Sequence, residues 1–358
     1  MTNGFSRRLH GVLIGSANYP NVNTGFLAAS GRSRFDKNSF LKNNLGFDSI
    51  VRMRRQLLKA SKKIEVKSNP SYLEDVKLTG MAVRPFDVDL SFKPSVYNTS
   101  SNYKELLPHG PSVKLEKLEL TSNPKIPRKI YRYADDYDVK ADISVKELYG
   151  KGYSEEYLSS LLSTSNLGLK TERKLVPTRW SITAVDDKLS IDLKNKLPDE
   201  SVDGGMVFYH SYLGNSFYVL LFPGPWEYEL IEITSEGIMR DYENVFGRKT
   251  YADDTTGGYY ACRLAVAEYL FKIGKQAKIL VVREIKDDYK FSLGVWVVRE
   301  AVRNAMENNI AIFDDVEELL NKAKFFINKD FLYTFGNYVK RSNVVNSVKN
   351  QKLLTNYK

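Results

Sequence analysis

Four carboxylates stand in two pairs whose spacing suits the binding of a cation. Asp186 and Asp187 are adjacent in LVPTRWSITAVDD, and Glu227 and Glu229 alternate in FPGPWEYELIE. Alternation along a strand puts both glutamates on one face, where like charges repel unless a cation or acid–base chemistry uses them. These four are the candidate catalytic residues of a metal-dependent enzyme, with Arg179 steadying a phosphate.

Each pair also has a structural explanation. Glu227 and Glu229 can be solvated positions on an exposed face, or they can meet arginines such as Arg263 and Arg283. The adjacent aspartates fall in the middle of an expected helix, beside its apolar stripe, and there they need a cation such as Arg179 or a metal ion. The sequence leaves both alternatives open.

Polar and basic segments suited to nucleic acid form a second group. GSANYPNVNTG can present backbone N–H groups and amide side chains, a stretch from Arg52 to Lys67 is rich in cations, and two prolines extend NPKIPRKIYR. Each feature also has a structural alternative. GSANYPNVNTG can be a well-ordered turn, the cation-rich stretch a solvated helix face, NPKIPRKIYR a crossing between elements, and Trp180 a core residue. The candidate nucleic-acid and phosphate-binding residues are Asn18, Tyr19, Asn21, Asn23, Arg52, Arg54, Arg55, Lys125, Arg128, Lys129, Arg179 and Trp180.

The chain ends in QKLLTNYK, which places Gln351, Leu354 and Tyr357 at the first, fourth and seventh positions of a peptide. This is the spacing of a peptide that binds the sliding clamp PCNA. A single helical turn directs Leu354 and Tyr357 into one apolar groove, while Gln351 hydrogen-bonds at its edge. Lys358 stands where many such peptides carry a second aromatic, and a frayed amphipathic tail is the structural alternative.

Mixed helices and strands must position these residues. The expected strands are residues 11–15, 83–92, 206–212, 216–222, 226–233 and 278–284. The expected helices are residues 48–63, with Asp48 as N-cap, and residues 139–149, 154–162, 182–196, 258–273, 295–307 and 316–326. Leu213-Gly214-Asn215 predicts a hairpin, and Pro223-Gly224-Pro225 predicts a turn into a third strand of a meander. The fold class is therefore α+β, with a mixed, largely antiparallel sheet, flanking helices and two closely associated domains.

Composition limits the class of protein. The 358 residues carry a formal net charge of +10 and include one cysteine and three histidines, so no disulfide and no zinc module is expected. No apolar run is long enough to span a membrane, and no secretion signal is present, which predicts a cytoplasmic protein without a membrane partner. The basic balance favours a polyanionic partner.

The runs GSANYPNVNTG, GPSVKLEKLELTSNPKIPRK, LVPTRWSITAVDD, YLGNSFYVLLFPGPWEYELIE and GGYYACRLAV resemble, in this order, the archaeal Nre family of DNA repair proteins. The resemblance implies an N-terminal domain over residues 1–232, a C-terminal domain over residues 233–340, and a role in repairing DNA damage. The remaining residues 341–358 are expected to form a flexible tail that carries the clamp peptide. Many members begin with a cysteine-rich, zinc-finger-like segment. This chain has no cysteine before Cys262, so zinc is not expected.

Two functions follow from these observations. In the first, the protein is a DNA repair factor that binds DNA or nucleotide and is recruited to the clamp by QKLLTNYK. In the second, it is a nuclease-like or phosphodiesterase-like enzyme whose carboxylates hold a divalent metal. The sequence assigns neither an oligomeric state nor a lesion.

Overall fold

A computed structural model describes residues 3–29, 40–41, 43–93, 107–289, 291–307, 309–313, 317–321, 336 and 339–350. The chain divides into two compact units, Met1–Leu189 and Ser190–Lys358. Each unit has its own sheet, and the boundary falls within one long helix. The α+β class expected from the sequence is confirmed.

The N-terminal unit is built on a closed five-stranded barrel. Its strands are β1 (Asn3–Ile14), β2 (Asn21–Ala29), β3 (Leu58–Glu65), β4 (Phe86–Lys93) and β5 (Ser112–Leu120). They close in the order β1-β2-β3-β5-β4. Strands β3 and β5 run parallel, and the other neighbours run antiparallel. The long β1 pairs with β4 over residues 3–9 and with β2 over residues 8–14, and its register with β2 shifts between Leu9 and Gly11.

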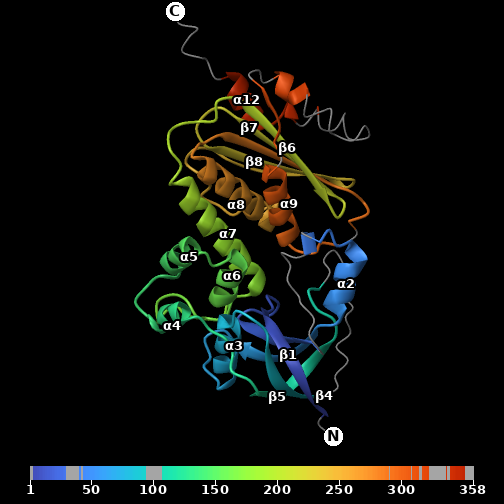
Figure 1. The fold of residues 1–358 in the computed structure, drawn as a ribbon, viewed down its shortest axis with the longest axis vertical. Helices are drawn as coiled ribbons and strands as arrows, with labels where there is room; N and C mark the ends of the chain where they lie inside the picture. Colours follow the sequence, from blue (N-terminus) through green and yellow to red (C-terminus); the bar gives the residue numbers. More distant parts are fainter. Residues whose placement is uncertain are drawn as a thin grey trace, which may run out of the picture. The chain divides into compact units, whose positions relative to one another are not determined.

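Alternation along β2 and β3 fills the barrel. Val22, Phe26 and Ala60 point into the apolar core, whereas Asn21, Asn23 and Lys63 are exposed on the outer side. Helix α3 (Tyr72–Met81) adds Leu73 and Val76 to the same core. Figure 1 shows α3 beside the strand β1.

Further helices accompany the barrel in the described part of the chain. These are α2 (Phe47–Arg55), α4 (Arg128–Asp135), α5 (Ala141–Gly150), α6 (Glu155–Ser163) and α7 (Thr178–Lys194), whose last residues belong to the second unit. The expected helix over residues 48–63 is wrong in its second half, because the chain after Arg55 becomes β3. There Leu58, Ala60 and Ile64 recur with period two, so a strand buries them and a helix would not. The helix starts after Gly46, and Asp48 is not its N-cap.

The C-terminal unit contains a six-stranded sheet. Its strands are β6 (Gly205–Tyr212), β7 (Asn215–Phe222), β8 (Glu227–Thr234), β9 (Gly237–Glu243), β10 (Lys278–Ile285) and β11 (Asn309–Phe313). Their order is β11-β6-β7-β10-β8-β9, with β10 parallel to β8 and the other neighbours antiparallel. Helices α8 (Thr256–Ile273) and α9 (Trp296–Glu307) cover one face, and α12 (Asn343–Asn350) covers the other, as Figure 1 shows.

The hairpin between β6 and β7 is confirmed, and its turn residues Leu213 and Gly214 have φ of 52° and 72°. The meander is wrong, because β10 lies between β7 and β8. β10 carries the apolar run ILVV, residues 279–282, buried on both faces, and such a strand needs a central position.

Within the described ranges, we find no helix long and apolar enough to cross a membrane. Residues 317–321 of the helix expected over 316–326 are helical, and the rest lie outside the described residues.

Candidate nucleic-acid interface

The segments GSANYPNVNTG and LVPTRWSITAVDD meet in the N-terminal unit. The backbone N–H of Ile14 donates to Oγ1 of Thr178 over 2.9 Å, which ties the end of β1 to the start of α7. Beside this bond the rings of Tyr19 and Trp180 are in contact, with centroids 5.0 Å apart and planes tilted by 51°. Tyr19 is 39% exposed and Trp180 is 45% exposed. Trp180 is therefore not a core residue, and the two segments form one exposed aromatic surface.

Local backbone geometry sets Tyr19 and Trp180 in place. Asn18 has a φ of 62°, a left-handed conformation that asparagine tolerates, and its carbonyl accepts from the N–H of Asn21 over 2.8 Å. On the other side, the N–H of Trp180 donates to the carbonyl of Pro177 over 2.8 Å as α7 begins. Both rings are thus carried by hydrogen-bonded turns that are fixed before any ligand arrives.

Polar and cationic side chains surround this aromatic pair in the sequence. Asn21 and Asn23 are exposed on β2, and Arg179 is exposed in the first turn of α7. Amide and guanidinium groups suit contacts to bases and phosphates. The segment GSANYPNVNTG forms the turn between β1 and β2 and the start of β2, and its contact with nucleic acid stays a prediction.

The basic stretch is divided between two elements. Arg52 and Arg55 are exposed on α2, whereas Arg54 is buried, at 6% exposure, and does not join an outward cationic face. The cations further along lie on β3, where Lys63 is exposed and Lys59 is buried. The expectation that one helix would carry these charges therefore needs correction.

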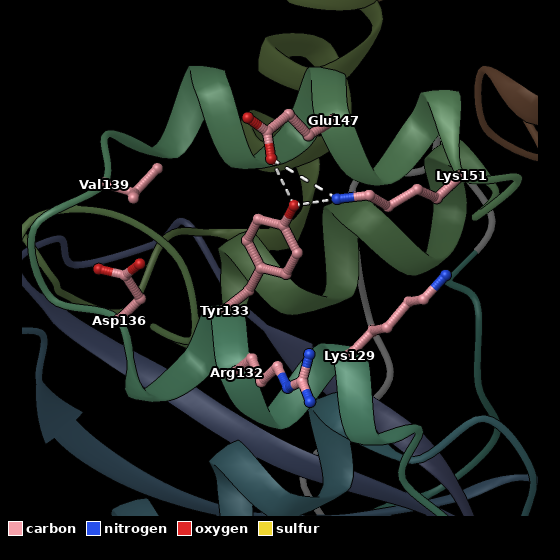
Figure 2. A pocket seen from close by; sticks show the side chains of 7 residues that line it. All are labelled: Lys129, Arg132, Tyr133, Asp136, Val139, Glu147 and Lys151. Atoms are coloured by element: carbon pink, nitrogen blue, oxygen red, sulfur yellow. Dashed lines mark hydrogen bonds and ion pairs between the residues drawn. The ribbon is translucent and has the colours of Figure 1, made fainter.

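A second basic site lies between α4 and the end of α5. A pocket of about 450 Å³ is lined by Lys129, Arg132, Tyr133, Asp136, Val139, Glu147 and Lys151. Figure 2 shows the Tyr133 hydroxyl between the Glu147 carboxylate and the Lys151 ammonium, hydrogen-bonded to both. The bond to Tyr133 raises the pKa of Lys151, which therefore remains a cation at neutral pH. Lys125 and Arg128, also exposed, precede or begin α4.

The two glutamates lie on one face of β8, as the alternation predicts, and they hold the C-terminal helix. Oε2 of Glu229 accepts from the Ser342 hydroxyl over 2.6 Å and from the Val344 N–H over 3.1 Å. Oε1 of Glu227 accepts from the Ser347 hydroxyl over 2.7 Å and lies 3.1 Å from Nζ of Lys278. This geometry gives the pair a structural role in attaching α12.

The arginines expected near these glutamates pair elsewhere. Arg263 bonds Glu243, and Arg283 bonds Glu232, each over 2.7 Å and in a buried setting on the opposite face of the sheet. Asp186 is fully buried and Asp187 half-buried, and both belong to the N-terminal unit, whereas Glu227 and Glu229 belong to the C-terminal unit. In the part of the chain that the structure describes, no group of three or more His, Cys, Asp or Glu is placed to hold a metal ion.

Family models match nearly the whole chain. A model described as archaeal Nre, N-terminal, matches residues 9–239, and one described as archaeal Nre, C-terminal, matches residues 243–357. The chain belongs to the archaeal Nre family. The resemblance seen in the sequence motifs is thereby confirmed.

Characterised Nre relatives carry DNA repair names. The chain is 35% identical over 325 residues to DNA repair protein NreA of Haloferax volcanii, covering 84% of this chain and 77% of the relative. It is 32% identical over 327 residues to NreA of Archaeoglobus fulgidus, with 87% and 82% covered, and 34% identical over 313 residues to NreB of the same organism, with 84% and 75% covered. No solved structure matches this Nre chain.

The sequence did not indicate several residues of the basic sites in this Nre chain. Lys59 falls in the second half of the wrongly expected helix. Tyr133 and Glu147 come from α4 and α5, and Lys151 directly follows α5; no local pattern reveals how these two helices pack. The period of two in LKASKKIE was the available signal for Lys59. The clamp-peptide residues Gln351, Leu354 and Tyr357 lie outside the described residues.

Proposed function

We propose that this protein is a DNA repair factor that binds DNA through its N-terminal unit and is recruited to the sliding clamp PCNA through QKLLTNYK. The repair role comes from the Nre relatives. Support for DNA binding comes from the net charge of +10 and from basic and aromatic side chains exposed on one unit.

One observation carries the DNA-binding proposal. Two segments separated by about 160 residues, the distance from Tyr19 to Trp180, place two large aromatic rings against each other and leave both well exposed. Exposed apolar rings lower the solubility of a protein, so a pair of them indicates a binding site. DNA bases stack on such rings. Exposed cations at Arg179, Arg52 and Arg55 supply phosphate contacts on the same unit.

Fluorescence anisotropy with labelled DNA tests this proposal. We expect the double substitution Tyr19→Ala with Trp180→Ala to weaken binding by about tenfold or more, since each base–aromatic stack contributes about 1–3 kcal/mol. Phe246→Ala is the matched control, because Phe246 is 91% exposed in the C-terminal unit. Equal affinity of the double variant and the wild-type protein would place the DNA surface elsewhere.

The clamp proposal rests on the spacing of Gln351, Leu354 and Tyr357 in the printed sequence. Replacing Leu354 and Tyr357 by Ala removes both apolar anchors and should abolish binding to purified clamp in calorimetry. Thr355→Ala, between the anchors, should leave affinity unchanged. Clamp binding that survives loss of both anchors contradicts the proposal.

A further inference from the structure

The topology of the N-terminal barrel matches a known class of nucleic-acid-binding barrel. Five strands close in the order β1-β2-β3-β5-β4, β3 runs parallel to β5, and α3 joins β3 to β4. The long β1 pairs with both β2 and β4 and shifts register at Gly11. This combination is that of the oligonucleotide/oligosaccharide-binding (OB) fold, which receives its ligand on β2, β3 and the β1–β2 loop.

The outer face of β2 and β3 is polar and compact in this protein. The register places Asn21 opposite Glu65, Asn23 opposite Lys63, Gly25 opposite Ser61 and Leu27 opposite Lys59. Their neighbours in the sequence, such as Val22 and Phe26, fill the barrel, so alternation directs this set outward. Asn21, Asn23 and Lys63 are exposed at one end of this face, whereas Gly25, Ser61 and Lys59 in its middle are buried.

Gly25 and Lys59 form the centre of this face. A Cβ at Gly25 would lie 2.6 Å from Cε and 2.7 Å from Cγ of Lys59, so the lysine stem crosses the strand where a side chain would otherwise stand. Lys59 is 8% exposed, and burial lowers its pKa. A desolvated ammonium gains more from an anion than a hydrated one does. Lys63 stands two residues before Glu65 on the same edge and remains exposed.

The aromatic pair stands at the start of the same face. Tyr19 lies in the β1–β2 loop two residues before β2, and Trp180 packs against it. From the Asn21 end of β2 to Lys59, six residues of β3 span about 20 Å, enough for several nucleotides. Stacking on Tyr19 and Trp180 needs a base whose face is uncovered, and duplex DNA covers its base faces with neighbouring pairs.

We propose that the outer face of β2 and β3, continued by the Tyr19–Trp180 pair, binds single-stranded DNA, with bases on the aromatic rings and phosphates on Lys59 and Lys63. This inference rests on the proposed DNA binding by the N-terminal unit. It adds that the DNA is single-stranded and that it follows the outer face of β2 and β3. Asn21 and Asn23 lie between the aromatic pair and Lys59 and contact base edges.

The test compares a labelled thymidine oligomer of about 15 nucleotides, near the upper footprint of one OB barrel, with a duplex of the same length, both titrated with the full chain. We expect tighter binding of the single strand. We also expect Lys63→Ala to weaken it by several-fold and to lower its salt slope by about one ion. The matched control is Lys117→Ala on β5, because the Lys117 side chain is 67% exposed on another strand of the same barrel.

Gly25→Val provides a second, independent variant, since a branched side chain must displace Lys59 from the face. Circular dichroism and thermal melting verify that the barrel is folded, and the Tyr19→Ala with Trp180→Ala protein gives a third comparison. Equal affinity for duplex and single strand, or equal effects of Lys63→Ala and Lys117→Ala, would overturn the proposed track while DNA binding itself stands. If the wild-type protein bound neither the single strand nor the duplex, the proposed function itself would be refuted.

Discussion

Replacing Glu229 by Ala should release helix α12 from the sheet of the C-terminal unit. One carboxylate oxygen accepts two hydrogen bonds, from the Ser342 hydroxyl at 2.6 Å and from the Val344 N–H at 3.1 Å, in a fully buried setting. Each hydrogen bond to a charged group contributes about 1.5–3 kcal/mol. Burial raises the pKa of Glu229, and this cost of burying the charge offsets part of the gain. We therefore expect α12 to lose about 2–4 kcal/mol of local stability.

Amide hydrogen exchange measures this loss directly. A cost of about 2–4 kcal/mol corresponds to protection reduced by about 30-fold to several hundred-fold in residues 343–350. The hydrogen bonds of Glu229 reach only the start of α12, so the rest of the unit should stay folded with unchanged protection. Asp203→Ala is the control, because the Asp203 side chain is 93% exposed. Wild-type protection of α12 in the Glu229→Ala protein would refute the assigned role of this carboxylate.

Three further predictions concern stability. Glu243→Ala leaves Arg263 buried without its carboxylate, and urea unfolding should show a loss of about 3–5 kcal/mol; a loss below about 1 kcal/mol would contradict it. Burial lowers the pKa of His109 to about 4, so the unfolded chain binds more protons between pH 6.5 and pH 4 and stability should fall as pH falls through that window. His109→Phe should reduce this slope, and an unchanged slope would exclude His109. Lys59→Met should stabilise the protein at neutral pH and weaken DNA binding. Burial lowers the pKa of Lys59, so the wild-type protein should gain stability as the pH rises toward 10.5, and the Lys59→Met protein should not. The same gain in both proteins would contradict this prediction.

Strong local patterns made most elements predictable. The β6–β7 hairpin follows from Leu213-Gly214-Asn215, and α8 follows from an apolar run closed by Gly274 in the left-handed conformation. The order of strands was not predictable in the same way. β10 enters between β7 and β8 because its buried residues need cover on both faces, and this requirement concerns the whole sheet rather than any one segment.

The aromatic site was partly predictable and its chemistry was not. Tyr19 and Trp180 stand out as residues in unusual segments, but their contact depends on a hydrogen bond between Ile14 and Thr178. Periodicity also placed Glu227 and Glu229 correctly on one face. Their partners come from α12, more than 100 residues away, so only the folded chain distinguishes an attachment point from a metal site.

The attachment of α12 also limits how the clamp peptide is presented. Val348 still packs against the core of the sheet, Asn350 ends the helix, and Gln351 follows at once, so only about 3 Å of helix separates the sheet from the peptide. If the peptide alone binds the clamp, a flexible Gly/Ser insertion of about ten residues between Asn350 and Gln351 should change affinity by less than about twofold. Calorimetry with purified clamp measures this, and an inserted scrambled peptide serves as the control. A loss of tenfold or more would show that the C-terminal unit itself contacts the clamp, because only a short connection would then hold both surfaces together.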